Sequence, residues 1–201
     1  MSYVWDTFIE NCQKYYKPGP YISIDEQLFP TKARCRFMQF MGSKPDKYGQ
    51  KFWLAVDKES KYTVNGFPHL GKDDQRPTNQ RLGDHVVTKL MQPYLNNGRN
   101  VICDNFFTSL ALAETLEMKR TSIVGTVNRA RREISTKIKT ARDELYSTTI
   151  LKKGNTSLTV YQGKPTKNVI LMSTMHPVVL IGTDTKKKPD TIKFYNESKY
   201  G

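Results

Sequence analysis

Two aspartates stand at positions where apolar strands are predicted to end. Asp25 follows the alternating residues 21–24, and Asp104 follows the apolar run 101–103. Carboxylate oxygens are the ligands that Mg²⁺ and Mn²⁺ prefer, and one or two suffice when water and substrate phosphate complete the coordination shell. The pair therefore indicates a metal site for cutting phosphodiester bonds, although 79 positions separate the two residues and each alone is more often a turn or cap residue.

The immediate neighbours of the two aspartates have simpler interpretations. In an extended segment Glu26 points to the face opposite Asp25, where an ion pair is favoured over a metal contact. Asn105 could orient a water molecule or close the turn after Asp104, and the turn is the favoured role. Neither neighbour is therefore assigned to the metal site.

The flanking elements explain why both aspartates are expected at strand ends. Ile22 and Ile24 alternate with polar residues, so Asp25 projects from the face opposite the isoleucines. The run 101–103 is apolar throughout, which is typical of a strand covered on both faces. Asp104 follows at the carboxyl end of this strand, where open α/β sheets place their ligands.

The rest of the chain alternates strands and helices as far as residue 127 and is richer in short strands beyond it. Helical spacing of apolar residues predicts helices, and alternating or wholly apolar runs predict strands. Pro18 and Pro93 are expected to end or bend the helices they meet. The expected helices are 6–16, 84–94 and 110–118, and the expected strands are 21–25, 34–41, 51–57, 61–65, 101–103, 122–127, 145–152, 157–162, 169–175 and 192–195.

Positive charge is concentrated in the last two-fifths of the sequence. The net charge is +13, with 17 Lys and Arg against 13 Asp and Glu in residues 1–120, and 15 against 6 in residues 121–201. A positive field attracts polyanions, so nucleic acid is the leading partner and a solubilising surface is the alternative. Six basic residues are available to neutralise phosphates: Arg129, Arg131, Arg132, Lys137, Lys139 and Arg142. For the cluster 129–132, DNA contact is favoured over a solvated loop.

Two further features have both a functional and an ordinary interpretation. Tyr161 and Phe194 could stack on an exposed base, but a position in the core is favoured. The run 186–188 consists of three lysines, which is compatible with a nuclear import signal and equally common in ordinary loops.

Cysteine usage and the absence of long apolar runs indicate an intracellular protein. Cys12, Cys35 and Cys103 lie far apart without the spacing of a zinc site, so they are expected to be reduced core thiols. No run of about 18 apolar residues occurs, and the N-terminus lacks a basic stretch followed by an apolar one. The chain is therefore expected neither to span a membrane nor to be secreted.

Short motifs occur in a fixed order along nearly the whole chain. They are Asp25-Glu-Gln27, Pro45-Asp-Lys-Tyr-Gly49, Asn65-Gly66, Cys103-Asp-Asn-Phe-Phe-Thr-Ser109, Ile123-Val-Gly-Thr-Val127 and Tyr195-Asn-Glu-Ser-Lys199. This series resembles the piggyBac family of transposases and their domesticated relatives, from about Phe8 to Gly201. Each motif alone is weak, but their unbroken order is specific.

The resemblance implies an α/β fold, with an RNase H-like mixed sheet, flanking helices and an inserted β-rich subdomain. Residues 1–128 would form the first part of the RNase H-like core with its N-terminal helix, residues 129–190 the basic β-rich insertion, and residues 191–201 the return to the core. The resemblance also implies cleavage and strand transfer of DNA at a two-metal site with Mg²⁺ or Mn²⁺. Three aspartates would hold the ions, and Asp25 and Asp104 match the first two.

The third aspartate is expected outside residues 1–201. In the family it follows the Tyr-Asn-x-Ser/Thr-Lys element by a few residues, which places it about two positions beyond Gly201. Asp184 and Asp190 flank the three lysines without matching this motif, so neither is assigned to the site. The site within this segment is expected to be incomplete, and the segment inactive or nearly so by itself.

Double-stranded DNA, as transposon ends and target, is the partner that the resemblance implies. It also implies a nuclear location, no membrane association, and a homodimer as one possibility for the full-length protein. Two other functions stay open. One is a catalytically inactive, domesticated DNA- or chromatin-binding domain, and the other is a basic RNA-binding protein, which would make the ordered motifs accidental.

Overall fold

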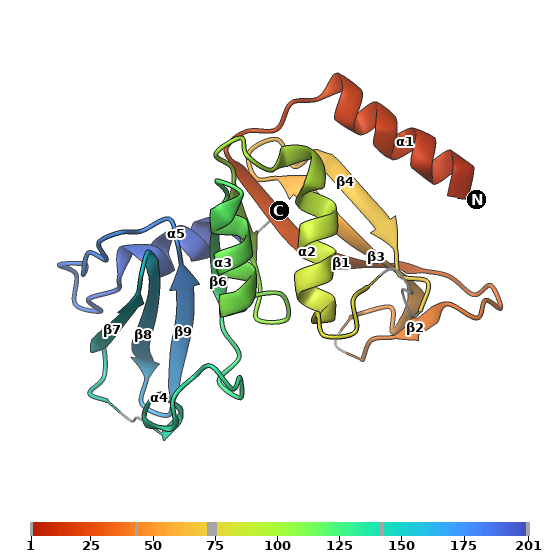
Figure 1. Ribbon diagram of the computed structural model, residues 1–201. Helices are drawn as coiled ribbons and strands as arrows, with labels where there is room; N and C mark the ends of the chain where they lie inside the picture. The colour runs from red at the N-terminus through yellow and green to blue at the C-terminus, as the bar shows by residue number, and fades with distance from the viewer. Residues whose placement is uncertain (1, 43, 72–75, 141–142, 200–201) are drawn as a thin grey trace.

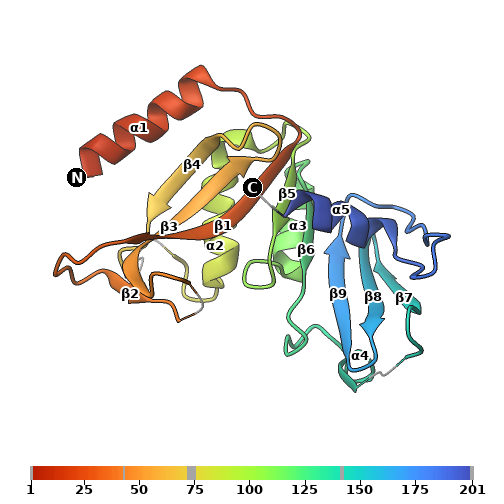
Figure 2. The same cartoon turned by 180° about the vertical axis from the view of Figure 1, so that it is seen from behind.

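Residues 2–42, 44–71, 76–140 and 143–199 are described by the computed structural model, which has an α/β fold with helices flanking one mixed sheet (Figures 1 and 2). The expected fold class is therefore confirmed. The strands are β1 (Tyr21–Pro30), β2 (Met38–Phe40), β3 (Tyr48–Asp57), β4 (Thr63–Pro68), β5 (Asn100–Cys103), β6 (Ser122–Thr126), β7 (Thr148–Lys153), β8 (Thr156–Lys164) and β9 (Lys167–Ser173).

The order of the strands places β1 and β5 side by side near the middle of the sheet. The order is β2-β3-β1-β5-β6-β9-β8-β7, and β4 pairs with β3 at one end. β1, β5 and β6 run parallel to one another, whereas the other pairings are antiparallel. The carboxyl ends of the parallel strands therefore meet at one edge, as in other open α/β sheets.

Helices cover both faces of the sheet. α2 and α3 lie on one face (Figure 1), and α5 lies on the other (Figure 2). α1 packs beside β4, where the indole Nε1 of Trp5 donates to the carbonyl of Gly66 at 3.0 Å. The helices are α1 (Ser2–Tyr15), α2 (Leu82–Met91), η1 (Gln92–Tyr94), α3 (Leu110–Met118), α4 (Thr136–Thr140) and α5 (Asp190–Ser198).

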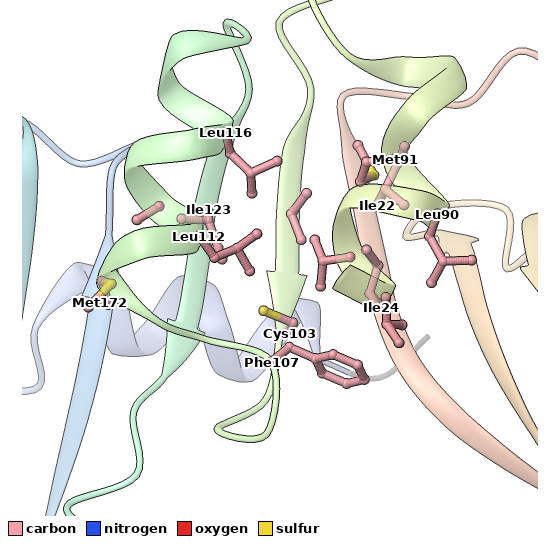
Figure 3. Packing of buried hydrophobic residues seen from close by; sticks show 14 of the residues in the cluster. Ile22, Ile24, Leu90, Met91, Cys103, Phe107, Leu112, Leu116, Ile123 and Met172 are labelled. Carbon is pink, nitrogen blue, oxygen red and sulfur yellow. The ribbon is translucent and has the colours of Figure 1, made fainter. Parts of the chain in front are cut away.

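The core consists of two clusters separated by the sheet. Side chains of alternate strand residues point to opposite faces, so Ile24 and Cys103 pack against α2 and α3, as Figure 3 shows. Ile102 points the other way and packs with Ile192 and Tyr195 of α5. β5 is thus buried on both faces, as the apolar run 101–103 predicted, and β1 is buried on both faces over residues 22–24.

The expected strand 192–195 is a helix, and this prediction was wrong. Ile192 and Tyr195 are three positions apart and both buried, while Lys193 between them is exposed, which is a helical pattern. Pro189 immediately precedes the helix and Asp190 occupies its first turn, positions at which these residues favour a helix start. The apolar run was too short to distinguish the two periods.

The segment after residue 128 joins the same sheet. β9 pairs with β6 through Val124–Ser173, Gly125–Met172 and Thr126–Leu171, and β8 and β7 follow as antiparallel neighbours. A division into core and insertion at residue 128 stays a prediction. None of the helices in the described ranges has the length and apolar character that crossing a membrane requires.

Candidate active site

The two aspartates lie at the same level on neighbouring parallel strands. The expected end of the first strand at Asp25 was wrong, because β1 continues to Pro30 and its residues 22–30 pair with β3. β1 and β5 are in register with Ile24 opposite Cys103. Asp25 and Asp104 are the next residues along these two strands. The long sequence separation between the aspartates is therefore closed by strand pairing.

Both aspartates belong to the face of the sheet that α5 covers. The Ser23 hydroxyl donates to the carbonyl of Ser198 in α5 at 3.1 Å, and Ile102 belongs to the cluster beneath this helix. Alternate residues of a strand share a face, so Asp25 follows Ser23 and Asp104 follows Ile102 onto the same side.

A cavity of about 150 Å³ opens between the ends of these strands and α5. Asp25 and Asp104 line it together with Tyr195 of α5, with Lys199 just after α5 and with Lys44 from the loop after β2. Asp25 is exposed and Asp104 is half-buried. The structure therefore brings the two sequence-predicted acids into one cavity.

Hydrogen bonds fix the turn that carries Asp104. The N–H of Phe106 donates to Asp104 Oδ1 at 2.9 Å, and the hydroxyl of Thr108 donates to the Asp104 carbonyl at 2.8 Å. Ser109 then caps α3 by accepting from the N–H of Leu112 at 3.0 Å. The expected turn is present, but Asp104 and Thr108 form these bonds, rather than the side chain of Asn105.

The surroundings of Asp104 raise its pKa. Burial makes the largest contribution and the charge of Asp25 adds to it, whereas the N–H of Phe106 and the charge of Lys51 act in the opposite direction. The anion is thus less stable in the fold than in water, partly because a second carboxylate is near. A cation bound between the two carboxylates would remove that repulsion.

Glu26 is drawn into the same electrostatic network. Burial, a hydrogen bond with Asp25 and the charge of Asp25 raise the pKa of Glu26 from 4.5 to about 7, while Lys51 and Lys44 act to lower it. The charge of Glu26 is therefore coupled to that of Asp25 and to those of Lys51 and Lys44. An ion pair with a single partner was the expectation from its place in the strand.

Aromatic packing holds a cation beside the carboxylates. Lys51 Nζ lies 3.8 Å from the centre of the Trp53 ring and 5.5 Å from that of Phe106. Burial lowers the pKa of Lys51, and the charges of Glu26 and the two aspartates raise it. The positive charge of Lys51 thus offsets part of the negative charge at the strand ends.

The donor set fits a hard divalent cation, with two carboxylates as its ligands. In the described ranges no group of three or more His, Cys, Asp and Glu side chains is arranged to hold a metal ion. Mg²⁺ needs only one or two protein carboxylates when water and phosphate supply the other oxygens. Asp25 and Asp104 share one cavity, and a divalent ion between their carboxylates would remove the repulsion between them.

Two of the arginines predicted to contact DNA make contacts within the protein. Arg129 donates from its guanidinium to Oδ1 of Asn168. Arg131 donates to the carbonyl of Asn105 at 2.7 Å and to that of Phe106 at 3.2 Å. No local pattern indicated these partners, because each lies 25 or more positions away in the chain.

The other predicted DNA contacts are spread along the segment before β7. Arg132 is exposed, and Lys139 in α4 is half-buried. The side chain of Lys137 and the whole of Arg142 lie outside the described part of the chain. A role in DNA binding for this segment stays a prediction.

The core position favoured for the two aromatics is confirmed. Tyr161 is buried, and its hydroxyl donates to the carbonyl of Lys186 at 2.6 Å. Phe194 packs on the same cluster with its ring centre 5.3 Å from that of Tyr21.

The two unassigned acids near α5 make local contacts. Asp184 Oδ2 lies 3.6 Å from Lys193 Nζ, and Asp190 Oδ1 accepts from the N–H of Thr191 at 2.6 Å. Neither Asp184 nor Asp190 is among the residues that line the cavity.

Sequence reasoning missed the contribution of α5 to the cavity. Tyr195 and Lys199 belong to the Tyr-Asn-Glu-Ser-Lys motif, so the signal was present, but the strand assignment hid their four-residue helical spacing. Burial raises the pKa of Tyr195 to about 12, which keeps its phenol neutral beside the carboxylates.

Comparisons with known proteins bear on the family and the fold of this chain. The family model described as Transposase IS4 matches residues 2–200. Human PiggyBac transposable element-derived protein 3 is 25% identical over 213 aligned positions, covering 94% of this chain and 34% of that protein. The human Chimeric ERCC6-PGBD3 protein is also 25% identical, over 94% of this chain and 19% of its own length.

A solved structure matches the fold over nearly the whole chain. The cryo-EM structure of the piggyBac transposase synaptic complex with hairpin DNA has a TM-score of 0.91 and 36% sequence identity, covering 98% of this chain and 42% of that chain. The resemblance inferred from the ordered motifs is therefore confirmed. This chain spans less than half the length of each of these relatives.

Proposed function

Because this chain belongs to the Transposase IS4 family, we propose that residues 1–201 form part of the catalytic core of a piggyBac-like DNA transposase. Asp25 and Asp104 are two of its metal-binding carboxylates in this proposal. The observation that carries it is the parallel register of β1 and β5, which sends both side chains into one cavity.

Each residue of the cavity has a task that follows from its environment. Asp25 and Asp104 would hold Mg²⁺ or Mn²⁺, and such ions activate an attacking oxygen and stabilise a leaving oxygen in phosphoryl transfer. The turn bonds of Asp104 keep its carboxylate directed into the cavity. Lys44 and Lys199 add positive charge to the lining, where a DNA phosphate must approach.

Double-stranded DNA, at transposon ends and at the target, is the proposed substrate, and the nucleus is the proposed location. The matched solved structure is a piggyBac transposase synaptic complex with hairpin DNA, which supports a DNA substrate for this chain. The net charge of +13 and its concentration in residues 121–201 support it independently. Arg132 and Lys139 are the proposed phosphate contacts, since Arg129 and Arg131 already bind protein groups.

The test is Mg²⁺-dependent nicking of a duplex that carries the terminal repeat of the parent element. The assay compares residues 1–201 with a version extended through the following residues of the gene, where the third carboxylate is expected. In the extended protein, Asp25→Asn and Asp104→Asn should lower the nicking rate about 100-fold or more, because even outer-shell changes at metal sites cost 10–100-fold. Asp6→Asn, at an exposed position in α1, is the control and should leave the rate unchanged.

A second candidate function is a domesticated DNA-binding domain without catalysis. It is favoured by the name of a curated relative, a transposable element-derived protein. Tight duplex binding with no nicking by the extended protein at any Mg²⁺ or Mn²⁺ concentration would establish this function in place of the first.

A further inference from the structure

We propose that Arg81 and Arg131 are positioning residues for Asp104, whose guanidinium groups hold the carbonyls of the turn that carries this carboxylate. The inference rests on the proposed function, because it takes Asp104 to be a metal ligand. The two arginines come from segments 50 positions apart and meet at one main-chain oxygen, that of Phe106.

Arg81 links the starts of two helices to the turn. Its Nη2 donates to the carbonyl of Phe106 at 2.8 Å, and its Nη1 donates to Asp84 Oδ1 at 2.9 Å. The same oxygen of Asp84 accepts the hydroxyl of Ser109 at 2.9 Å, and Ser109 caps α3. A chain of bonds thus runs from the start of α2 to the start of α3 across the turn.

Arg131, in the segment after β6, binds the same turn. Its Nη2 donates to the carbonyls of both Asn105 and Phe106, at 2.7 and 3.2 Å. Its Nε is buried and has no hydrogen-bond partner within the described ranges. The charges of Glu133 and Asp84 partly offset the repulsion between the two guanidinium groups, and burial together with that repulsion still lowers the pKa of Arg131. The position of Arg131 is therefore set by the turn rather than by solvent.

A displacement of the Asn105–Phe106 peptide would displace the carboxylate of Asp104. The Phe106 N–H that bonds to Asp104 Oδ1 belongs to the same residue as the carbonyl that both arginines bind. α2 packs directly on this unit, because a Cβ added to Gly83 would lie 2.7 Å from the Phe106 oxygen. The Phe106 ring stacks on Trp53, with 5.5 Å between ring centres, so the turn is packed on that side too.

An alternative role for the arginines is direct binding of a DNA phosphate. A second cavity, of about 350 Å³, lies beside the turn and is lined by both arginines together with Asn105 and Asn128. A phosphate contact would affect DNA affinity, whereas a positioning role would affect metal binding even without DNA. This difference separates the two roles experimentally.

The test measures Mn²⁺ binding by the extended protein of the nicking assay in the absence of DNA, by electron paramagnetic resonance of the free ion. Arg81→Gln and Arg131→Gln should each weaken Mn²⁺ binding about tenfold or more, the usual effect of removing an outer-shell partner. Arg131→Lys keeps the charge but lacks the planar fork that spans two carbonyls, so it should rescue little. Arg34→Gln makes the same change of charge at an exposed arginine outside the site and should bind Mn²⁺ within twofold of the parent.

Amide hydrogen exchange of residues 104–109 provides a readout that needs no metal. The two Gln variants should exchange at least several-fold faster here than the parent and the Arg34→Gln control, while the amides of β5 and β6 stay protected. Loss of protection in those strands would identify a variant that is unfolded. In that case the positioning role is judged from Arg131→Lys, which should bind Mn²⁺ more weakly than the parent while β5 and β6 stay protected.

The outcomes separate this inference from the proposed function. If the parent binds Mn²⁺ and the Gln variants bind it equally well, the positioning role is refuted and the function stands. If they bind Mn²⁺ normally but lose DNA affinity, the arginines are phosphate contacts. If the parent binds no Mn²⁺, or Asp25→Asn and Asp104→Asn leave binding unchanged, the proposed function fails and the positioning role for a metal ligand fails with it.

Discussion

Replacing Glu26 by glutamine should stabilise the protein at neutral pH in the absence of divalent ions. Burial and the adjacent Asp25 raise the pKa of Glu26 from 4.5 to about 7, so the fold favours the protonated form. Glutamine keeps the shape of the protonated acid and can still donate a hydrogen bond to Asp25. The substitution therefore removes a buried charge without removing the contact.

The expected gain in unfolding free energy follows from the pKa shift of Glu26. A change from 4.5 to about 7 corresponds to roughly 3.5 kcal/mol at about 1.4 kcal/mol per pKa unit. Glu26 is only half-buried, and solvent screens part of that energy, so about 1–2 kcal/mol is expected. Because the folded pKa is above the unfolded one, the penalty is absent below pH 4.5, grows between pH 4.5 and 7, and is complete above pH 7.

The assay is urea unfolding of the parent and Glu26→Gln at pH 5 and pH 8 with a chelator present. The stability difference should be larger at pH 8 by about 1 kcal/mol or more. Glu10→Gln, which alters an exposed acid on α1, should show no such dependence. Equal differences at the two pH values, or a less stable Glu26→Gln at pH 8, would refute the electrostatic reasoning for this site.

Three further outcomes are expected. Asp104→Asn should abolish nicking by the extended protein while duplex affinity stays within about twofold, because DNA affinity is attributed to phosphate contacts elsewhere. A loss of affinity as large as the loss of nicking would contradict this separation of catalysis from binding. Gly125→Ala should lower the unfolding free energy by about 1–3 kcal/mol in urea titrations. The added Cβ would lie 2.2 Å from Thr108 Oγ1 and 2.7 Å from the carbonyl oxygen of Cys103. A change below about 0.5 kcal/mol would show that the turn moves to make room for the methyl group. Arg132→Gln should reduce the slope of log affinity against log salt by about one unit, and an unchanged slope would remove this residue from the DNA contacts.

Local patterns drew attention to the two acids, and the ordered motifs of the family were needed to assign them to a candidate metal site. The alternation before Asp25 and the apolar run before Asp104 are visible within five residues, but β1 continues past Asp25 to Pro30. The step from strand ends to a shared cavity needed the pairing of β1 with β5, which the motif order implied and periodicity alone did not.

The rest of the site depends on contacts between distant segments. Arg131 was predicted to contact DNA because charge is visible in a sequence, whereas its acceptors are two carbonyls that are fixed only by folding. Lys51 owes its place to the rings of Trp53 and Phe106, which come from different elements. α5 was mistaken for a strand because four residues satisfy either period, and burial of Ile192 with Tyr195 decided between them.

The strand order also sets when the site can form during synthesis. The hairpins formed by β1, β3 and β4 involve near neighbours and can pair as soon as residue 68 has emerged from the ribosome. The other edge of β1 must remain unpaired until β5 appears more than 30 residues later, which leaves an apolar strand edge open to wrong partners. Translation speed between these two strands should therefore influence how much of the nascent protein aggregates.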